Sequence, residues 1–191
     1  MTNHDQPMPR MCPEADMLVI LQAIRETDER TLDVLNQSLR TWPRDPRIHL
    51  LVGAMHASRQ VYESARSSFE EALRLSPDYP IASFMLGFLE LVNGHPESAD
   101  SAWTALDALP ADDTLRIFRS GLSSLVENRF DDALLQLRHG IAMNERYPLI
   151  NHYVRTVIAA IDRDSAPRDG SARAAVDPSI LAGRYDTPSR S

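Results

Sequence analysis

The chain contains 191 residues, 43% of them hydrophobic, and carries a formal net charge of −7. This length is sufficient for one domain with a substantial core, and no apolar run approaches the roughly 18 residues that cross a bilayer, so we expect no membrane insertion. The negative charge disfavours attraction to phosphate groups, so nucleic acid is not an expected partner.

Residues 1–7 contain neither the basic residues nor the apolar stretch of a secretory signal, so we expect a flexible N-terminal segment at residues 1–13 and a cytoplasmic protein. Cys12 is the one cysteine of the chain, which excludes an internal disulfide and a Cys-x-x-Cys site. We interpret it as an incidental residue near a loose end.

Over residues 46–146 the hydrophobic pattern predicts three successive pairs of helices, and no segment alternates as strands do. In the first pair, helical runs over residues 48–58 and 62–75 flank a short polar turn. The dipeptide Asn93-Gly94 supplies the turn of the second pair, and residues 127–129 supply that of the third. The predicted fold class is therefore all-α.

Small residues recur along these pairs with a period of 34 residues. A glycine lies within each first helix, and an alanine lies early in each second helix. Because a unit of this length cannot close a core by itself, its neighbours must stack on it. The period therefore predicts a protein built from helical repeats. The recurring residues are Gly53, Gly87 and Gly121, and Ala65, Ala99 and Ala133.

A bulky residue follows each of these alanines at the same distance, at Phe69, Trp103 and Leu137. With small and bulky positions in this register, the sequence resembles the tetratricopeptide repeat (TPR), a helical hairpin of about 34 residues. Small residues let two helices approach closely, and the bulky residue fills the gap beside them. The resemblance implies a TPR α-solenoid, a right-handed superhelix of antiparallel helical hairpins. It departs from the family at two aromatic packing positions, which are His49 and His56 in the first repeat.

The repeat register divides the chain into segments. A degenerate hairpin with Val19 and Leu35 at its small and bulky positions precedes the repeats, and a helix that caps the last apolar face follows them. From residue 162 onward, turn-forming and charged residues without periodicity predict a disordered tail. The expected segments are a TPR domain at 14–161, made of a degenerate hairpin at 14–44, repeats at 46–79, 80–113 and 114–147 and a capping helix at 148–161, and a tail at 162–191.

A short apolar cluster interrupts the predicted tail at Ile180, Leu181 and Tyr185. It is either incidental apolar content or a docking peptide for a partner or for the protein's own groove. The sequence leaves both interpretations open.

In the TPR family the first helix of each pair lines the inner, concave face. The resemblance therefore implies a mostly apolar groove that binds an apolar peptide or helix of another protein. Leaving a large apolar side chain in water forgoes about 1.5–3 kcal/mol, so we expect a partner to cover this lining. The alternative is that the chain buries these positions with its own helices. The expected lining consists of Leu50, Ala54, Ile81, Phe84, Met85, Phe88, Leu91, Leu115, Phe118, Arg119, Leu122 and Leu125.

A substitution at Phe88 distinguishes these two interpretations. If Phe88 faces the groove, Phe88→Asp abolishes partner capture and leaves the helical content intact. If the substitution collapses the fold, Phe88 belongs to the core.

No arrangement of residues in the sequence indicates catalysis, a metal site or a bound cofactor. His49 and His56 share a helix face, but no third ligand lies at metal-binding spacing. The chain has no lysine, which excludes a phosphate-binding loop of the Gly-x-x-x-x-Gly-Lys type. Arg47 and Arg119 are candidates to hold an acidic group at the rim of an apolar ligand, because Arg forms forked hydrogen bonds with carboxylates.

We therefore expect a non-catalytic adaptor or assembly factor that binds another protein. One alternative is a chaperone for a hydrophobic client, because the chain is similar in acidity, size and repeat number to the cytoplasmic chaperones of bacterial type III secretion translocators. Another alternative is a self-assembling structural subunit, such as a homodimer, in which the groove or an end surface pairs with a second copy.

Overall fold

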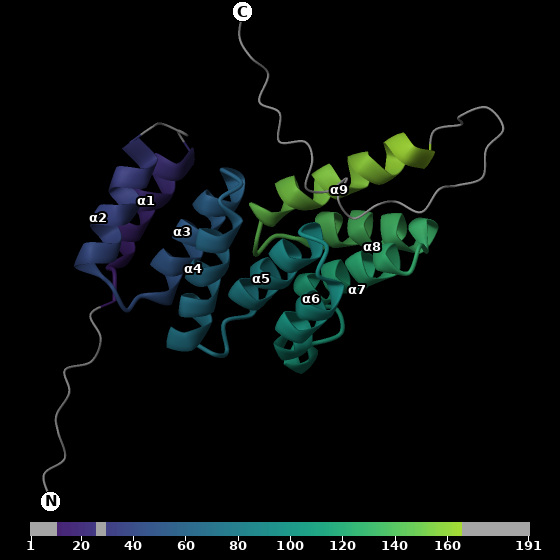
Figure 1. Ribbon diagram of the computed structural model, residues 1–191, viewed down its shortest axis with the longest axis horizontal. Helices are drawn as coiled ribbons and strands as arrows, with labels where there is room; N and C mark the ends of the chain where they lie inside the picture. The colour runs from purple at the N-terminus through teal and green to yellow at the C-terminus, as the bar shows by residue number, and fades with distance from the viewer. Residues whose placement is uncertain (1–10, 26–29, 166–191) are drawn as a thin grey trace, which may run out of the picture. The chain divides into compact units, whose positions relative to one another are not determined.

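The computed structural model describes residues 11–25 and 30–165 (Figure 1). All regular structure within these ranges is helical, which confirms the all-α prediction for the described part of the chain. The chain divides into two compact units, Met1–Ala82 (unit 1) and Ser83–Ser191 (unit 2), and each is described by itself. The elements are α1 (Glu14–Arg25), α2 (Arg30–Thr41), α3 (Pro46–Ser58), α4 (Tyr62–Leu75), α5 (Pro80–Val92), α6 (Pro96–Trp103), the 3-10 helix η1 (Thr104–Ala108), α7 (Thr114–Val126), α8 (Phe130–Met143) and α9 (Ile150–Ser165).

In unit 1, α3 and α4 form a closely packed pair. α3 begins at Pro46, whose fixed φ suits the first helical position. The side chain of Asp45 caps this helix by accepting a hydrogen bond from the backbone N–H of Arg47 at 2.9 Å. Gly53 lies beside the ring of Phe69, and a Cβ atom at Gly53 would meet that ring at 2.5 Å. The glycine therefore sets how closely the two helices approach.

The hairpin of α1 and α2 shares an apolar core with α3. Leu35 is buried in this core, as its bulky repeat position predicts, together with Met17, Ile20 and Ile48. The predicted inward position of Val19 is wrong, because Val19 is exposed and Ile20 takes the buried place. Successive residues of a helix are about 100° apart, so a register difference of one position turns a side chain from the core to solvent.

Cys12 also belongs to the core of unit 1, although the sequence analysis places it in a flexible segment that ends at residue 13. Its side chain is buried, and its backbone N–H donates to Oδ2 of Asp45 at 2.8 Å. From residue 12 onward the segment is therefore joined to the turn between α2 and α3. Residues 1–10 lie outside the described part of the chain.

In unit 2 the contact between a glycine and a bulky side chain occurs twice more. Gly87 of α5 lies against the Trp103 ring at the end of α6, and Gly121 of α7 lies against Leu137 of α8. The Trp103 ring is further fixed, because its Nε1 donates a hydrogen bond to the backbone oxygen of Phe84 at 3.1 Å. In these two pairs, as in α3 and α4, a glycine of the first helix contacts a bulky side chain of the second.

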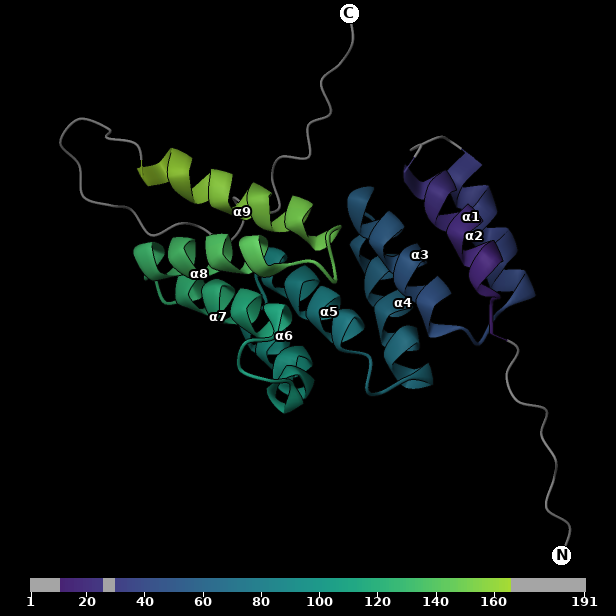
Figure 2. The ribbon, with the colours of Figure 1, turned by 180° about the vertical axis from the view of Figure 1, so that it is seen from behind.

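The last described helix, α9, lies along α8 (Figure 2). Its apolar residues recur every three or four positions, which places them on one helix face. That face is buried, so α9 covers apolar surface that unit 2 would otherwise leave in water. The buried residues of this stripe are Ile150, Val154, Val157 and Ile161.

The predicted tail differs from the structure at its start. α9 continues to Ser165, and Asp162 accepts a hydrogen bond from Arg138 of α8 at 3.0 Å. The chain is therefore helical beyond the expected boundary at residue 162. The apolar cluster of Ile180, Leu181 and Tyr185 lies outside the described residues.

We expect Gly87→Ala to destabilise unit 2. Alanine favours a helix by about 1 kcal/mol over glycine, but a Cβ atom at this position would overlap Nε1 and Cδ1 of Trp103. Overpacking costs roughly 1–3 kcal/mol, and the rigid, hydrogen-bonded ring has little room to yield. The net effect should be a loss of up to about 2 kcal/mol, measured by urea unfolding followed by circular dichroism.

The matched control for this prediction is Gly121→Ala. A Cβ atom there would lie 2.8 Å from Cδ2 and Cγ of Leu137 and 3.3 Å from its backbone N, and the leucine side chain changes rotamer more easily than a hydrogen-bonded indole ring. We expect Gly121→Ala to lose less stability than Gly87→Ala. The reverse order would contradict the proposed role of the Trp103 contact.

Candidate functional site

The structure buries most of the residues that the sequence analysis assigns to an open groove. In unit 1, Leu50 is buried, and Ala54 and Ile81 are half-buried. Phe88 in unit 2 exposes only 7% of its surface. The expectation that the aromatic lining is exposed is therefore wrong. The buried residues of this set in unit 2 are Phe84, Met85, Phe88, Leu91, Leu115, Phe118, Leu122 and Leu125.

Aromatic contacts explain this burial. The ring centroid of Phe84 lies 6.3 Å from that of Trp103 and 6.0 Å from that of Phe118. The Phe88 ring lies 6.0 Å from the ring of Tyr153 in α9, in an edge-on arrangement. Burial raises the pKa of the Tyr153 hydroxyl. These rings form the core of unit 2, and α9 supplies the side chain that covers Phe88.

Both arginines that were expected to anchor an acidic group are paired within the chain. Arg119 binds Asp107 and donates to the backbone oxygen of Trp103 at 3.2 Å. Arg47 binds Asp45 at 2.8 Å. An incoming carboxylate would have to displace these partners, so neither guanidinium is ready for a ligand.

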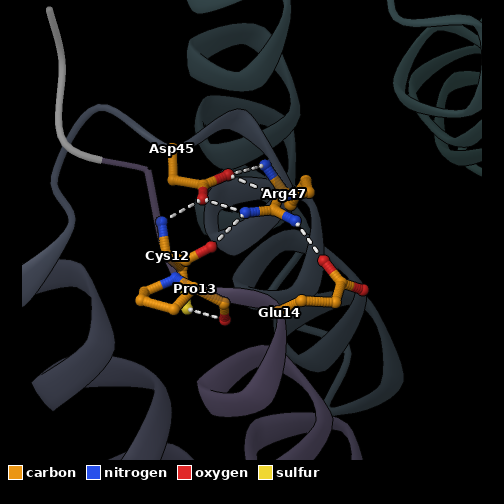
Figure 3. A network of polar contacts seen from close by, with 5 residues as sticks. All are labelled: Cys12, Pro13, Glu14, Asp45 and Arg47. Atoms are coloured by element: carbon orange, nitrogen blue, oxygen red, sulfur yellow. Dashed lines mark hydrogen bonds and ion pairs between the residues drawn. The ribbon is translucent and has the colours of Figure 1, made fainter.

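Figure 3 shows that Asp45 stands at the centre of a polar network before α3. Its carboxylate is fully buried, with 0% of the residue exposed, and accepts hydrogen bonds from the backbone N–H groups of Cys12 and Arg47 and from the Arg47 guanidinium. Arg47 also donates to the backbone oxygen of Cys12 at 2.6 Å and to Glu14 at 3.2 Å. The network joins the start of α1 to the start of α3.

The electrostatics of this network indicate a structural role. Burial alone would raise the pKa of the Asp45 carboxyl, but the hydrogen bonds from Arg47 and from the backbone of Cys12 outweigh it, and the pKa lies below its ordinary value. Burial, and then the charge of Asp45, raise the pKa of the Cys12 thiol. A protonated, buried thiol is a poor nucleophile, so the network holds the chain together and offers no reactive group.

Two histidines make polar contacts at turns. His49 Nε2 hydrogen-bonds to the backbone oxygen of Pro43 at 2.8 Å, and Nδ1 of His95 lies 3.1 Å from the buried carboxylate of Glu90. Among the described residues no group of three or more His, Cys, Asp or Glu side chains lies close enough to hold a metal ion.

An open apolar depression of about 590 Å³ lies between α1 and α2 in unit 1. Val19 of α1, Val34 of α2 and Trp42, directly after α2, contribute apolar surface to it. Asp16 and Asp33, one from each helix, add carboxylates to its lining. We call this depression the α1/α2 groove.

The groove was not predicted from the sequence, because the repeat register places Val19 at an inward position. A signal was nevertheless present, since α1 carries apolar residues on two faces. Met17 and Ile20 face the core, whereas Leu18 and Val19 are 61% and 64% exposed. A helix at the edge of a fold needs only one apolar stripe to pack, so a second one indicates a surface available for binding.

No family model, curated protein or solved structure matches this chain. Within residues 11–25 and 30–165, every helix is too short or too polar to cross a bilayer.

Proposed function

We propose that this chain is a TPR-like, non-catalytic adaptor or assembly factor that binds an apolar helix or peptide of another protein. The likeness to TPR hairpins is supported by the contact between a glycine and a bulky side chain, which occurs in three helix pairs at the period of the sequence repeat. Stacked helical hairpins of this kind present extended surfaces to other proteins. A single cysteine that is free fits a reducing compartment such as the cytoplasm.

The observation that carries the binding function is the exposed apolar surface of α1 at the α1/α2 groove. The predicted inner lining of unit 2 is core, so a partner would have to open the unit in order to reach it. Val19, in contrast, is already exposed and lines the α1/α2 groove. This surface is available without any rearrangement of the described helices.

The test is isolation of a partner by the full chain from its native cell, followed by reconstitution with the purified partner. We expect a saturable complex whose formation has a negative heat capacity change in titration calorimetry, because apolar surface is buried on binding. Light scattering over a dilution series serves as the control for self-association. If no purified protein binds saturably, the adaptor function is wrong, and a stable homodimer would favour the structural-subunit alternative.

A further inference from the structure

The α1/α2 groove has the form of a site for a third helix. It is lined by Val19 and Ile20 of α1, by Val34 of α2 and by Trp42, which directly follows α2. Side chains spaced three and four positions apart form ridges with a groove between them, into which the ridge of another helix fits. An amphipathic helix that lays its apolar face into such a groove is a recurring mode of protein recognition.

The charges of the groove restrict what can occupy it. Among the described side chains that line it, the charged ones are Asp16 and Asp33, and both are exposed. A two-fold dimer through this face would bring Asp16 and Asp33 of the second copy into the same interface, which would then hold four carboxylates. Like charges brought together repel, whereas a Lys or Arg of an occupant would be attracted to both sides.

We propose that the α1/α2 groove binds an amphipathic helix of another protein whose bulky apolar residues are flanked by Lys or Arg. This inference rests on the proposed function and adds the location and the chemistry of the partner. The apolar face of the incoming helix packs on Val19, Val34 and Trp42, and its basic flanks pair with Asp16 and Asp33.

The chain carries its own probe for this experiment. It has two tryptophans, of which Trp42 lines the groove and Trp103 is buried in unit 2. Acrylamide quenching therefore reports chiefly on Trp42. The ligand is an Ala-based helical peptide with Leu at every third or fourth position and Lys beside the Leu stripe, and the matched peptide has Glu in place of Lys.

We expect the Lys peptide to protect Trp42 from acrylamide and to bind the full chain at least about tenfold more tightly than the Glu peptide. Val19→Asp should weaken binding of the Lys peptide by about tenfold or more, since it places a charge in the apolar contact. The double variant Asp16→Asn, Asp33→Asn should lose the preference for Lys over Glu. Leu135→Asp, at an exposed position of α8, is the control that should leave binding unchanged.

Several results would overturn the inference. Equal binding of the two peptides would remove the charge argument, and unchanged binding by Val19→Asp would place the site elsewhere. A dimer that Val19→Asp dissociates would identify a second copy as the occupant. If a peptide of residues 178–187 bound more tightly than the Lys peptide, the occupant would be the chain's own C-terminal segment.

The Val19→Asp variant also distinguishes this inference from the proposed function. A purified partner that binds the original chain and Val19→Asp equally leaves the adaptor function intact and removes the groove assignment. Since Val19 is exposed, the variant should retain the melting temperature of the original chain. Val19→Ser, a smaller polar change at the same exposed position, provides a second variant if Val19→Asp folds poorly.

Discussion

The Phe88→Asp variant is expected to lose the folded state of unit 2 and not merely a binding surface. The side chain is 7% exposed, and its ring packs edge-on against Tyr153. Truncating a buried Phe costs roughly 3–5 kcal/mol, and an unpaired buried carboxylate adds a desolvation penalty. Because a domain is stable by only about 5–15 kcal/mol, this single change should remove most of the stability of the unit.

The measurement is urea unfolding followed by the emission of Trp103, in a Trp42→Phe background, so that the signal comes from unit 2. Leu135→Asp introduces the same carboxylate at a position of α8 that is 71% exposed, and it should change stability by less than about 0.5 kcal/mol. An unfolding midpoint for Phe88→Asp equal to that of the Leu135→Asp control would place Phe88 at the surface. That result would support the interpretation that Phe88 lines an open groove.

The helices and their pairing could be predicted from the sequence because the signals for them are local. In the first repeat, Gly53 on α3 and the bulky Phe69 on α4 set how closely the two helices approach. The same short-range pattern recurs along the chain. Turns follow from equally local chemistry. Gly94, for example, adopts a φ of 81°, which the Asn-Gly pair predicts.

Burial of the candidate lining could not be predicted in the same way. A long apolar helix such as α5 looks identical in sequence whether a partner or the chain itself covers it. The deciding contact joins Phe88 to Tyr153, which belong to helices far apart in the chain. A register count assigns each of them a face, but it does not show that α9 brings Tyr153 to Phe88.

Asp45 shows a second limit of prediction. An Asp directly before Pro46 indicates a helix cap, and the structure contains that cap. Nothing in the local sequence shows that Cys12 returns to the same carboxylate and donates its backbone N–H. The long-range partner converts an ordinary cap into the joint between α1 and α3.

Replacing Asp45 by Ala is therefore expected to cost more than the loss of a cap. The cap alone is worth about 1 kcal/mol, and the change also leaves the buried N–H of Cys12 without its acceptor and removes the Arg47 ion pair. An unsatisfied buried donor adds roughly 1–3 kcal/mol, so unit 1 should lose about 2–4 kcal/mol in total. Urea unfolding followed by Trp42 emission measures this loss, and Asp78→Ala, at an exposed loop position, is the control.

The effect of Asp45→Ala should also depend on pH, with a sign fixed by the lowered pKa of the Asp45 carboxyl. A carboxyl whose pKa is lower in the folded chain stabilises the fold above its unfolded pKa of about 3.9, and this contribution is lost as the pH falls through the folded value. The original chain should therefore lose stability in acid, and its advantage over Asp45→Ala should shrink there. A difference between the two chains that stays constant from neutral pH to well below the unfolded pKa would show that the charge of Asp45 contributes nothing. The capping geometry would then account for the whole effect, since a neutral acceptor at the same place satisfies the backbone N–H groups equally well.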